Sequence, residues 1–378
     1  MRYTSKITID PLGHCLDSAQ FFTEDVVSSM VYDVWYDMWC MMYSVWCDVH
    51  PAIPALTNAS TYTRCKVYGR TAMVLAQAFE VFGIRPVARS AIKNVTFYVM
   101  SSNDDAGKTY GQYWTSLDAF PSPSMTDFYL HADHTASRIA SPSASSLTYA
   151  YDPADPVPTI GGNNLPDSIG GTIPCGPLDQ SPLANRQDIL FFTTEVQKTP
   201  LYLSGSILAT IFVSSDMKDT DFMVKVSDVY PDSKTEILIQ DNAVRMRWRE
   251  GGLDANYLSP DTVYKVDLNL WNTSFVVAPG HALRMAITSS NYPRFSVNPN
   301  NGLLLADAAY PGANFTAKNT LHVGGRYASK ITLPIVQRGD LPNVHVLKEV
   351  QTMYPVLTGD FIKNNVDNLN KLAIRMKH

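Results

Sequence analysis

Residues Gly280–Gly302 have the sequence GHALRMAITSSNYPRFSVNPNNG, the most informative stretch of this chain. Within its first half, Leu283–Thr288 places an apolar side chain at every second position. A period of two predicts a β-strand with one face in the core. The second half, from Ser289 onward, is rich in Asn, Ser and Pro, which favour turns and bond the backbone locally. The stretch therefore predicts a strand that runs into a long, ordered loop.

Other segments of the C-terminal half repeat this period of two. Val266–Leu270 alternates apolar and polar residues, and Val244–Arg249 does so with Met246 and Trp248 on the same face. Turns rich in Pro, Gly and Asp separate these segments. We therefore predict a mainly β fold, with a jelly-roll β-sandwich over residues 187–340.

The remaining chain divides into three zones. Residues 1–105 mix two patterns: Asn94–Met100 predicts a buried strand, and Gly69–Gly83 predicts an amphipathic helix between two glycines. Residues 106–186 are rich in Pro, Gly and Ser without periodicity and predict an ordered connection. Residues 341–378 predict a tail that ends in an amphipathic helix.

Composition excludes several classes of function. The chain has 378 residues, of which 45% are hydrophobic and 17% charged, as in globular proteins. Its net charge of −5 gives no reason to expect nucleic acid as a partner. The five cysteines show neither metal-ligand spacing nor a disulfide framework, so no metal or other cofactor is expected. We expect no signal peptide, because residues 1–15 contain no long apolar run. We expect no membrane span either, because Asp33 and Asp37 interrupt the apolar run Met30–Trp46; the compartment stays open.

A series of short motifs resembles one family of hydrolases. Their order and spacing are similar to those of the C-terminal domain of Xaa-Pro dipeptidyl-peptidases and cocaine-esterase (CocE/NonD) hydrolases. That family joins an α/β-hydrolase domain to a β jelly roll, so the resemblance implies that residues 1–105 are a remnant of the hydrolase domain. It also implies a small-molecule ester or peptide substrate and a possible homo-oligomer. The motifs are Asp155–Thr159, Gly176–Gln180, Asn185–Asp188, Asp228–Asp232 and Ser289–Phe295.

The resemblance also implies a Ser–Asp–His triad, with the serine in a G-x-S-x-G elbow. The stretch Lys6–His14 looks like the family's G-P-W-x-H turn, so His14 is the one residue carried over as catalytic, as the triad base. Asp10 replaces the family's Gly and Leu12 its Trp. Ser206 lacks the flanking glycine pattern, and the family's serine and acid would precede Met1.

Two interpretations of the function follow. The first is a serine hydrolase of the dipeptidyl-peptidase or acyl-ester type that is incomplete and inactive as this chain, for example through an incomplete gene model. The alternative is a non-enzymatic β-sandwich module that binds a partner or carbohydrate.

Residues 28–68 fit nothing in the family pattern. Glu24–Val27 would join directly to Gly69–Thr71, and the segment between holds three of the five cysteines and three of the six tryptophans. We predict a foreign insert, such as translated intron; a genuine family-specific insertion is the alternative. Asp37 lies in a Trp-Tyr-Asp sequence like that of the family's acid, but it follows His14 instead of preceding it.

Other polar residues favour structural roles. Asp104 and Asp105 favour a polar turn over a replacement for the acidic residue of the triad. His131 and His134 are poorly spaced to bind one metal ion together. Arg245, Arg247 and Arg249 are predicted to form an exposed strand face that nearby aspartates neutralise. His281 is predicted to be structural. The last prediction is a polar cluster that fixes the long loop, made of Ser289, Ser290, Asn291 and Arg294.

Overall fold

The computed structural model describes most of the C-terminal two thirds of the chain. Described are Lys93 and residues 95–102, 107–164, 173–232, 234–251, 254–302 and 315–344, together with the backbone of Ile7–Ile9 and Cys15–Leu16. Several predictions lie outside these residues: the helices at Gly69–Gly83 and in the tail, the insert at 28–68, and the side chains Asp37, Asp104 and Asp105. The division of the chain into zones likewise stays a prediction.

The regular structure of the described residues is mainly β, without an α-helix among them. No helix in the described part is long and apolar enough to span a membrane. Short 3-10 turns are η2 (Ser181–Leu183), η3 (Met246–Trp248), η5 (Gly325–Tyr327) and η6 (Arg338–Asp340). The strands are β1 (Ile7–Ile9), β2 (Cys15–Leu16), β3 (Val95–Ser101), β4 (Tyr113–Leu117), β5 (Ser124–Leu130), β6 (Thr135–Ser137), β7 (Ser145–Tyr151), β8 (Leu190–Thr194), β9 (Leu201–Ser215), β10 (Asp221–Val229), β11 (Glu236–Arg245), β12 (Tyr264–Val277), β13 (Ala282–Thr288), β14 (Ala317–Val323) and β15 (Lys330–Val336).

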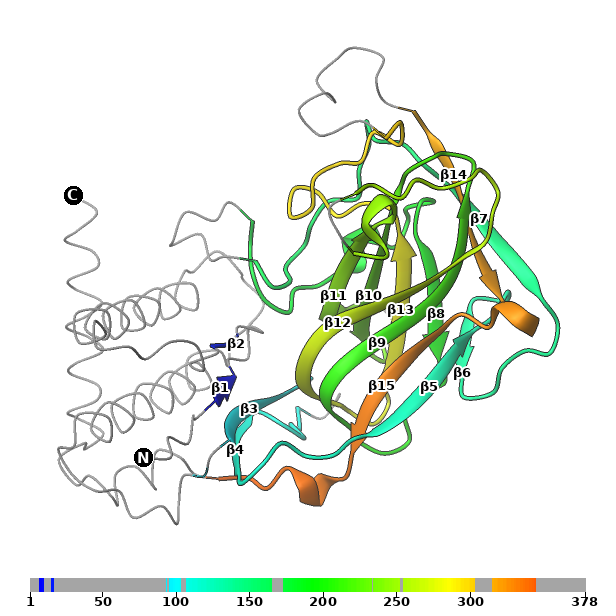
Figure 1. Ribbon diagram of the computed structural model, residues 1–378. Coiled ribbons are helices and arrows are strands. Elements are labelled where there is room, and N and C mark those ends of the chain that lie inside the picture. Colours follow the sequence, from blue (N-terminus) through cyan, green and yellow to red (C-terminus); the bar gives the residue numbers. More distant parts are fainter. Residues whose placement is uncertain are drawn as a thin grey trace, which may run out of the picture.

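The strands form one hydrogen-bonded sheet that curls on itself (Figure 1). Its main path runs β11-β10-β13-β8-β6-β5-β15-β9-β12-β3-β1-β2, while β14 pairs with β7 and β9, and β4 pairs with β3. Most pairs are antiparallel; β3 pairs in parallel with both β1 and β12, and β6 with β8. The curl brings β11 near β12, so apolar faces from distant parts of the path enclose one core.

The longest strands, β9 and β12, pair along almost their whole length and carry the middle of this core. The alternation of Val266–Leu270 is confirmed, because Val266, Leu268 and Leu270 are buried between exposed neighbours. The strands predicted at Asn94–Met100 and Leu283–Thr288 are also confirmed, as β3 and β13.

The strand predicted over Val244–Arg249 is wrong in its second half. β11 ends at Arg245, and Met246–Trp248 form the turn η3. Met246 and Arg247 are buried there, whereas Trp248 is 36% exposed, so the expected common face does not exist. The chain turns because the backbone N–H of Arg247 bonds Asp219 and that of Met246 bonds Thr220, which draws η3 away from the β-ladder.

Residues 107–164 hold four strands of this sheet, β4 to β7, in a stretch whose composition predicted a connection. Only the part that follows β7 runs as a long loop. Its apolar side chains pack on the outer face of β13 in a small cluster separate from the main core. This cover explains why β13 is buried on both faces although it alternates in sequence. The members of this cluster are Val157, Leu183, Ile189 and Ala286, with Ile160 and Phe191 at its edge.

Candidate functional site

His14, the one predicted catalytic residue, lies outside the described residues. Ser206, which the sequence does not favour as a nucleophile because it lacks the flanking glycine pattern, lies on β9. Its hydroxyl donates to Asn272 Oδ1 at 2.6 Å. Among the described residues, acyl-transfer chemistry would therefore need one of the other serines, paired with a histidine.

Two serine–histidine pairs lie within hydrogen-bond distance. Ser137 Oγ is 2.9 Å from His131 Nε2, and Ser214 Oγ is 3.0 Å from His322 Nε2. A nucleophilic serine also needs a carboxylate to orient its histidine. Neither imidazole bonds a carboxylate among the described residues, and burial lowers the pKa of His322, which favours its neutral form. His134, expected to be a poor metal ligand, contacts the Phe191 carbonyl through Nδ1 at 3.0 Å.

His281 has the carboxylate but no serine. Its Nδ1 is 3.1 Å from both Asp228 oxygens, and both side chains are fully buried. The Tyr230 ring packs against the imidazole at 4.3 Å between centroids. The pair therefore ties the turn before β13 to β10, which agrees with the structural role predicted for His281.

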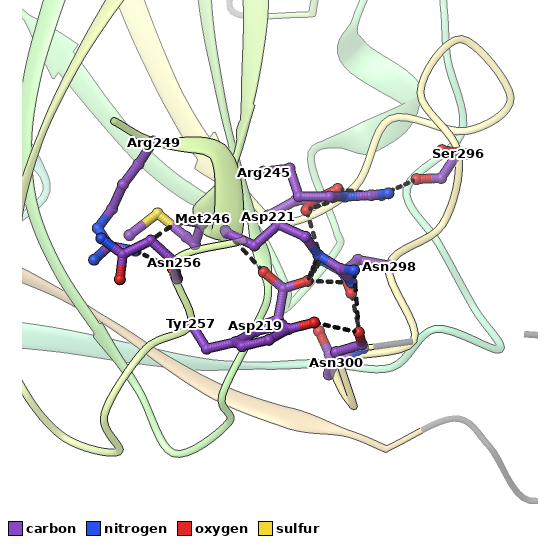
Figure 2. A network of polar contacts seen from close by, with 12 residues as sticks. Asp219, Asp221, Arg245, Met246, Arg249, Asn256, Tyr257, Ser296, Asn298 and Asn300 are labelled. Atoms are coloured by element: carbon purple, nitrogen blue, oxygen red, sulfur yellow. Dashed lines mark hydrogen bonds and ion pairs between the residues drawn. The ribbon is translucent and has the colours of Figure 1, made fainter. Parts of the chain in front are cut away.

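A network of aspartates, arginines and asparagines joins η3 to the long loop after β13 (Figure 2). Arg247 pairs with Asp219 at 2.7 Å, and Arg245 pairs with Asp221 at 2.9 Å. Asn298 Nδ2 bridges the two carboxylates at 2.9 and 2.7 Å. Burial raises the pKa of Asp221, against the lowering effect of Arg245. The aspartates do neutralise these arginines, as predicted, but Arg247 is buried instead of exposed.

A second network fixes the same loop from its other end. Asn291 Nδ2 donates to Asp241 Oδ2 at 3.0 Å, and Arg294 bonds Asp241 Oδ1. Lys225 Nζ donates to Asn291 Oδ1 at 3.2 Å, and burial lowers the pKa of this lysine. Gly162, at φ +94°, lies so close that a Cβ there would be 2.7 Å from Arg294 Nη1. The predicted role of Ser289–Asn291 and Arg294 in holding the loop is confirmed.

A cavity of about 190 Å³ lies where β3, β9, β11 and β12 meet. Two amide side chains meet at its polar side: Asn163 Nδ2 donates to Gln240 Oε1 at 2.9 Å, and Gln240 Nε2 donates to the backbone carbonyl of Asn272 at 3.0 Å. These residues come from a loop and two strands far apart in sequence, so no local pattern could have predicted them. The lining consists of Phe97, Tyr98, Met100, Phe120, Pro121, Asn163, Ser204, Gly205, Ile239, Gln240, Asn272, Thr273 and Ser274.

Comparison with known proteins identifies the family. A family model described as the X-Pro dipeptidyl-peptidase C-terminal non-catalytic domain matches residues 91–332. The chain belongs to this family. The match begins well before Gln187, so it includes the strands β3 to β7 as well as the later ones.

Relatives place this family member among the CocE/NonD-type hydrolases. A cocaine esterase from Rhodococcus is 37% identical over 262 residues, which is 66% of this chain and 43% of the esterase. A putative serine esterase of Mycobacterium bovis is 26% identical over 244 residues, which is 59% of this chain and 36% of that protein. The chain thus spans less than half the length of these curated relatives.

Solved structures share the fold. An aminopeptidase from a marine-sediment Thaumarchaeota archaeon superposes with a TM-score of 0.60 at 25% identity, covering 71% of this chain and 44% of that one. An α-amino acid ester hydrolase superposes with a TM-score of 0.57 at 23% identity, covering 69% of this chain and 44% of that one.

Proposed function

We propose that the curled sheet is the jelly-roll accessory domain of a serine hydrolase that cleaves ester or peptide bonds of small substrates. Residues 1–105 are then the remnant of its α/β-hydrolase domain, with His14 as the triad base. The membership of residues 91–332 in a non-catalytic domain family of hydrolases carries this proposal. The esterase and aminopeptidase named for its relatives support the substrate class.

The contacts of the described serines and histidines support a second part of the proposal, that this chain does not catalyse hydrolysis by itself. Ser137 and Ser214 face imidazoles without a bonded carboxylate, and the His281–Asp228 pair is sealed in the core. A serine hydroxyl activated without the whole triad gives a rate far below that of an esterase.

Activity assays on the purified 378-residue chain test this. We expect no turnover of p-nitrophenyl acetate or of Gly-Pro-p-nitroanilide above buffer, and no labelling by a fluorophosphonate, with an unrelated serine esterase as the positive control. His14→Gln should leave this background unchanged. Stoichiometric labelling of one serine that is lost on its change to alanine would show that the chain holds a working nucleophile.

A second candidate function is that of a binding module without catalysis. The cavity between β3, β9, β11 and β12 favours it, because a pocket with apolar walls and a few polar groups is the usual form of a small-molecule site.

A further inference from the structure

Strand β12 carries an exposed tryptophan at a break in its pairing with β9. The register shifts between Asn269 and Asn272, so two residues of β12, Leu270 and Trp271, lie opposite one residue of β9. Leu270 is fully buried, whereas Trp271 is 55% exposed. A bulge of this kind adds one residue to a strand and redirects a side chain. Here it turns an indole toward solvent.

The backbone of Trp271 is held in a conformation that bulky residues rarely adopt, with φ +76°. Such strain persists where the surroundings enforce it. The Trp271 N–H donates to Asn269 Oδ1 at 2.8 Å. Asn242 Nδ2 donates to the Asn269 carbonyl at 2.8 Å, and Gln240 Nε2 donates to the carbonyl of Asn272 at 3.0 Å. The indole therefore stands on a fixed backbone, which lowers the entropy lost when a ligand binds it.

Two exposed amides flank this indole in sequence. Asn269 and Asn272 pair with Leu208 and Ser206, which are two residues apart on β9, so both amides lie on the outer face of the sheet. Asn269 Oδ1 accepts the Trp271 N–H, and Asn272 Oδ1 accepts the Ser206 hydroxyl at 2.6 Å. These bonds fix the orientation of both amides. Neither Nδ2 group has a hydrogen-bond partner among the described residues, so each has donors to spare.

The surface around the indole offers no unpaired charge among these residues. Asp267, the preceding outward residue of β12, bonds Lys265 at 2.8 Å and Thr210 at 2.6 Å. Leu208 is 37% exposed and adds a second apolar group. An ionic ligand would therefore lose hydration without gaining a counter-charge. A neutral, hydroxylated ring suits the surface, because its C–H face can pack on the indole while its hydroxyls accept hydrogen bonds from the amides.

We propose that Trp271, Leu208, Asn269 and Asn272 form a surface site for a neutral sugar, one pyranose ring of an oligosaccharide. The apolar face of the ring packs on Trp271, and its hydroxyls accept hydrogen bonds from Asn269 Nδ2 and Asn272 Nδ2. The site requires no bond cleavage, so it goes beyond the proposed hydrolase function and is tested independently of it.

Titration of neutral oligosaccharides into the full chain tests the chemistry. Cellotriose, lactose and mannotriose are added, and binding is followed by saturation-transfer NMR and calorimetry. We expect saturable binding of at least one sugar in the millimolar to high-micromolar range, as a single aromatic platform allows. Sorbitol, which has the hydroxyls but no ring, should bind at least about tenfold more weakly. Absence of saturable binding by all three sugars, or equal binding of sorbitol, would overturn the proposal.

Trp271→Gly separates binding from folding. Glycine adopts a positive φ without strain, so the melting temperature should not fall, whereas sugar binding should be lost. The control is Trp248→Ala, which removes another exposed indole. Trp248 lies toward the start of β12, since its neighbour Arg249 lies over the Tyr264 ring at 4.5 Å. Unchanged sugar binding in Trp271→Gly, or an equal loss in Trp248→Ala, would contradict the assignment.

Asn269→Asp and Asn272→Asp test the two donors. Each change keeps the oxygen that accepts the protein's own hydrogen bond and removes only the N–H donor. We expect each variant to keep its fold and to bind the sugar about fivefold more weakly. Wild-type affinity in both variants would refute the role of the amides. Sedimentation velocity adds a further test, because a dimer that Trp271→Gly abolishes would assign this surface to a second copy of the chain and overturn the proposal.

Discussion

Arg247 and Asp219 show how much a single buried contact contributes to this fold. Their side chains are 2% and 0% exposed, and Arg247 also donates to the Gly302 carbonyl at 3.1 Å. Removing one partner of a buried ion pair leaves the other charge without compensation, which typically costs about 3–5 kcal/mol. The pair therefore holds η3 and the long loop together only while both residues are present.

Arg247→Met should accordingly lower the free energy of unfolding by about 3–5 kcal/mol in urea denaturation. Lys265→Ala is the control, because the Lys265–Asp267 pair is 56% and 62% exposed and should contribute less than about 1 kcal/mol. The double variant Asp219→Asn/Arg247→Met should recover part of the loss. Equal, small effects of both single variants would argue against a structural role for the buried pair.

Arg294 belongs to the second network and gives a separate prediction. Arg294→Ala leaves the nearly buried Asp241 with Asn291 and Lys225 only, so we expect a loss of about 2 kcal/mol. The control is Arg326, because both arginines lie over an aromatic ring, Arg294 over Phe295 and Arg326 over Tyr327, but Arg326 is exposed. Arg326→Ala should change stability by less than about 0.5 kcal/mol. Thermal unfolding of the two variants side by side measures the difference, and a loss for Arg294→Ala no larger than the control's would refute it.

At the scale of elements, the turn between β14 and β15 depends on backbone shape. Gly324 has φ +68° and ψ 174°, a region open to almost no residue but glycine, and a Cβ there would lie 2.2 Å from the Ser143 carbonyl oxygen. The turn therefore packs directly on the loop before β7, the partner of β14.

Gly324→Ala should cost about 3 kcal/mol, since strain and overlap with the backbone of Ser143 add together. Gly107→Ala is the matched control: φ is +75°, but nothing lies within 4 Å of the added Cβ, so only the strain of about 1–2 kcal/mol remains. Chemical denaturation of both variants should rank them in this order, and the reverse order would contradict the overlap argument.

The same scale shows what a sequence can predict. The period of two located β12 and β13, because one face of each strand meets the core. It failed at Met246–Trp248, where the backbone N–H groups of Arg247 and Met246 donate to Asp219 and Thr220, which are distant in sequence. The motif at Ser289–Phe295 predicted a fixed loop, but its partners Asp241 and Lys225 could not be inferred, since they depend on the curl of the sheet. The cavity was missed for the same reason.

For the whole molecule, buried tyrosines predict sensitivity to alkali. Burial raises the pKa of Tyr113 to about 12, and it also raises those of Tyr149 and Tyr151, from an ordinary value of 10.0. The unfolded chain ionises these phenols near pH 10 while the folded chain keeps them neutral. Their contribution to stability is thus complete below pH 10 and is lost progressively above it, up to about pH 12 for Tyr113.

Urea denaturation of the wild type and of Tyr149→Phe between pH 7 and 11.5 measures this effect. The variant should lose about 1 kcal/mol at pH 7, because Tyr149 Oη and Ser289 Oγ share a hydrogen bond of 2.7 Å. Above pH 10 its stability should fall less steeply than that of the wild type. Parallel curves over the whole range would show that this phenol does not contribute.

Strand β4 and the last described residues, 341–344, lie together at one edge of the sheet. The Val344 N–H donates to the Trp114 carbonyl at 2.8 Å, and Tyr113 Oη donates to the Leu341 carbonyl at 2.8 Å, beside β3. A unit whose two ends lie together can be spliced into a host chain, or have its ends exchanged, without unthreading its core. Residues 93–344 therefore form a segment whose two ends lie close together in space. A circular permutant that joins Val344 to Lys93 through a short linker and opens in an exposed turn should keep its fold.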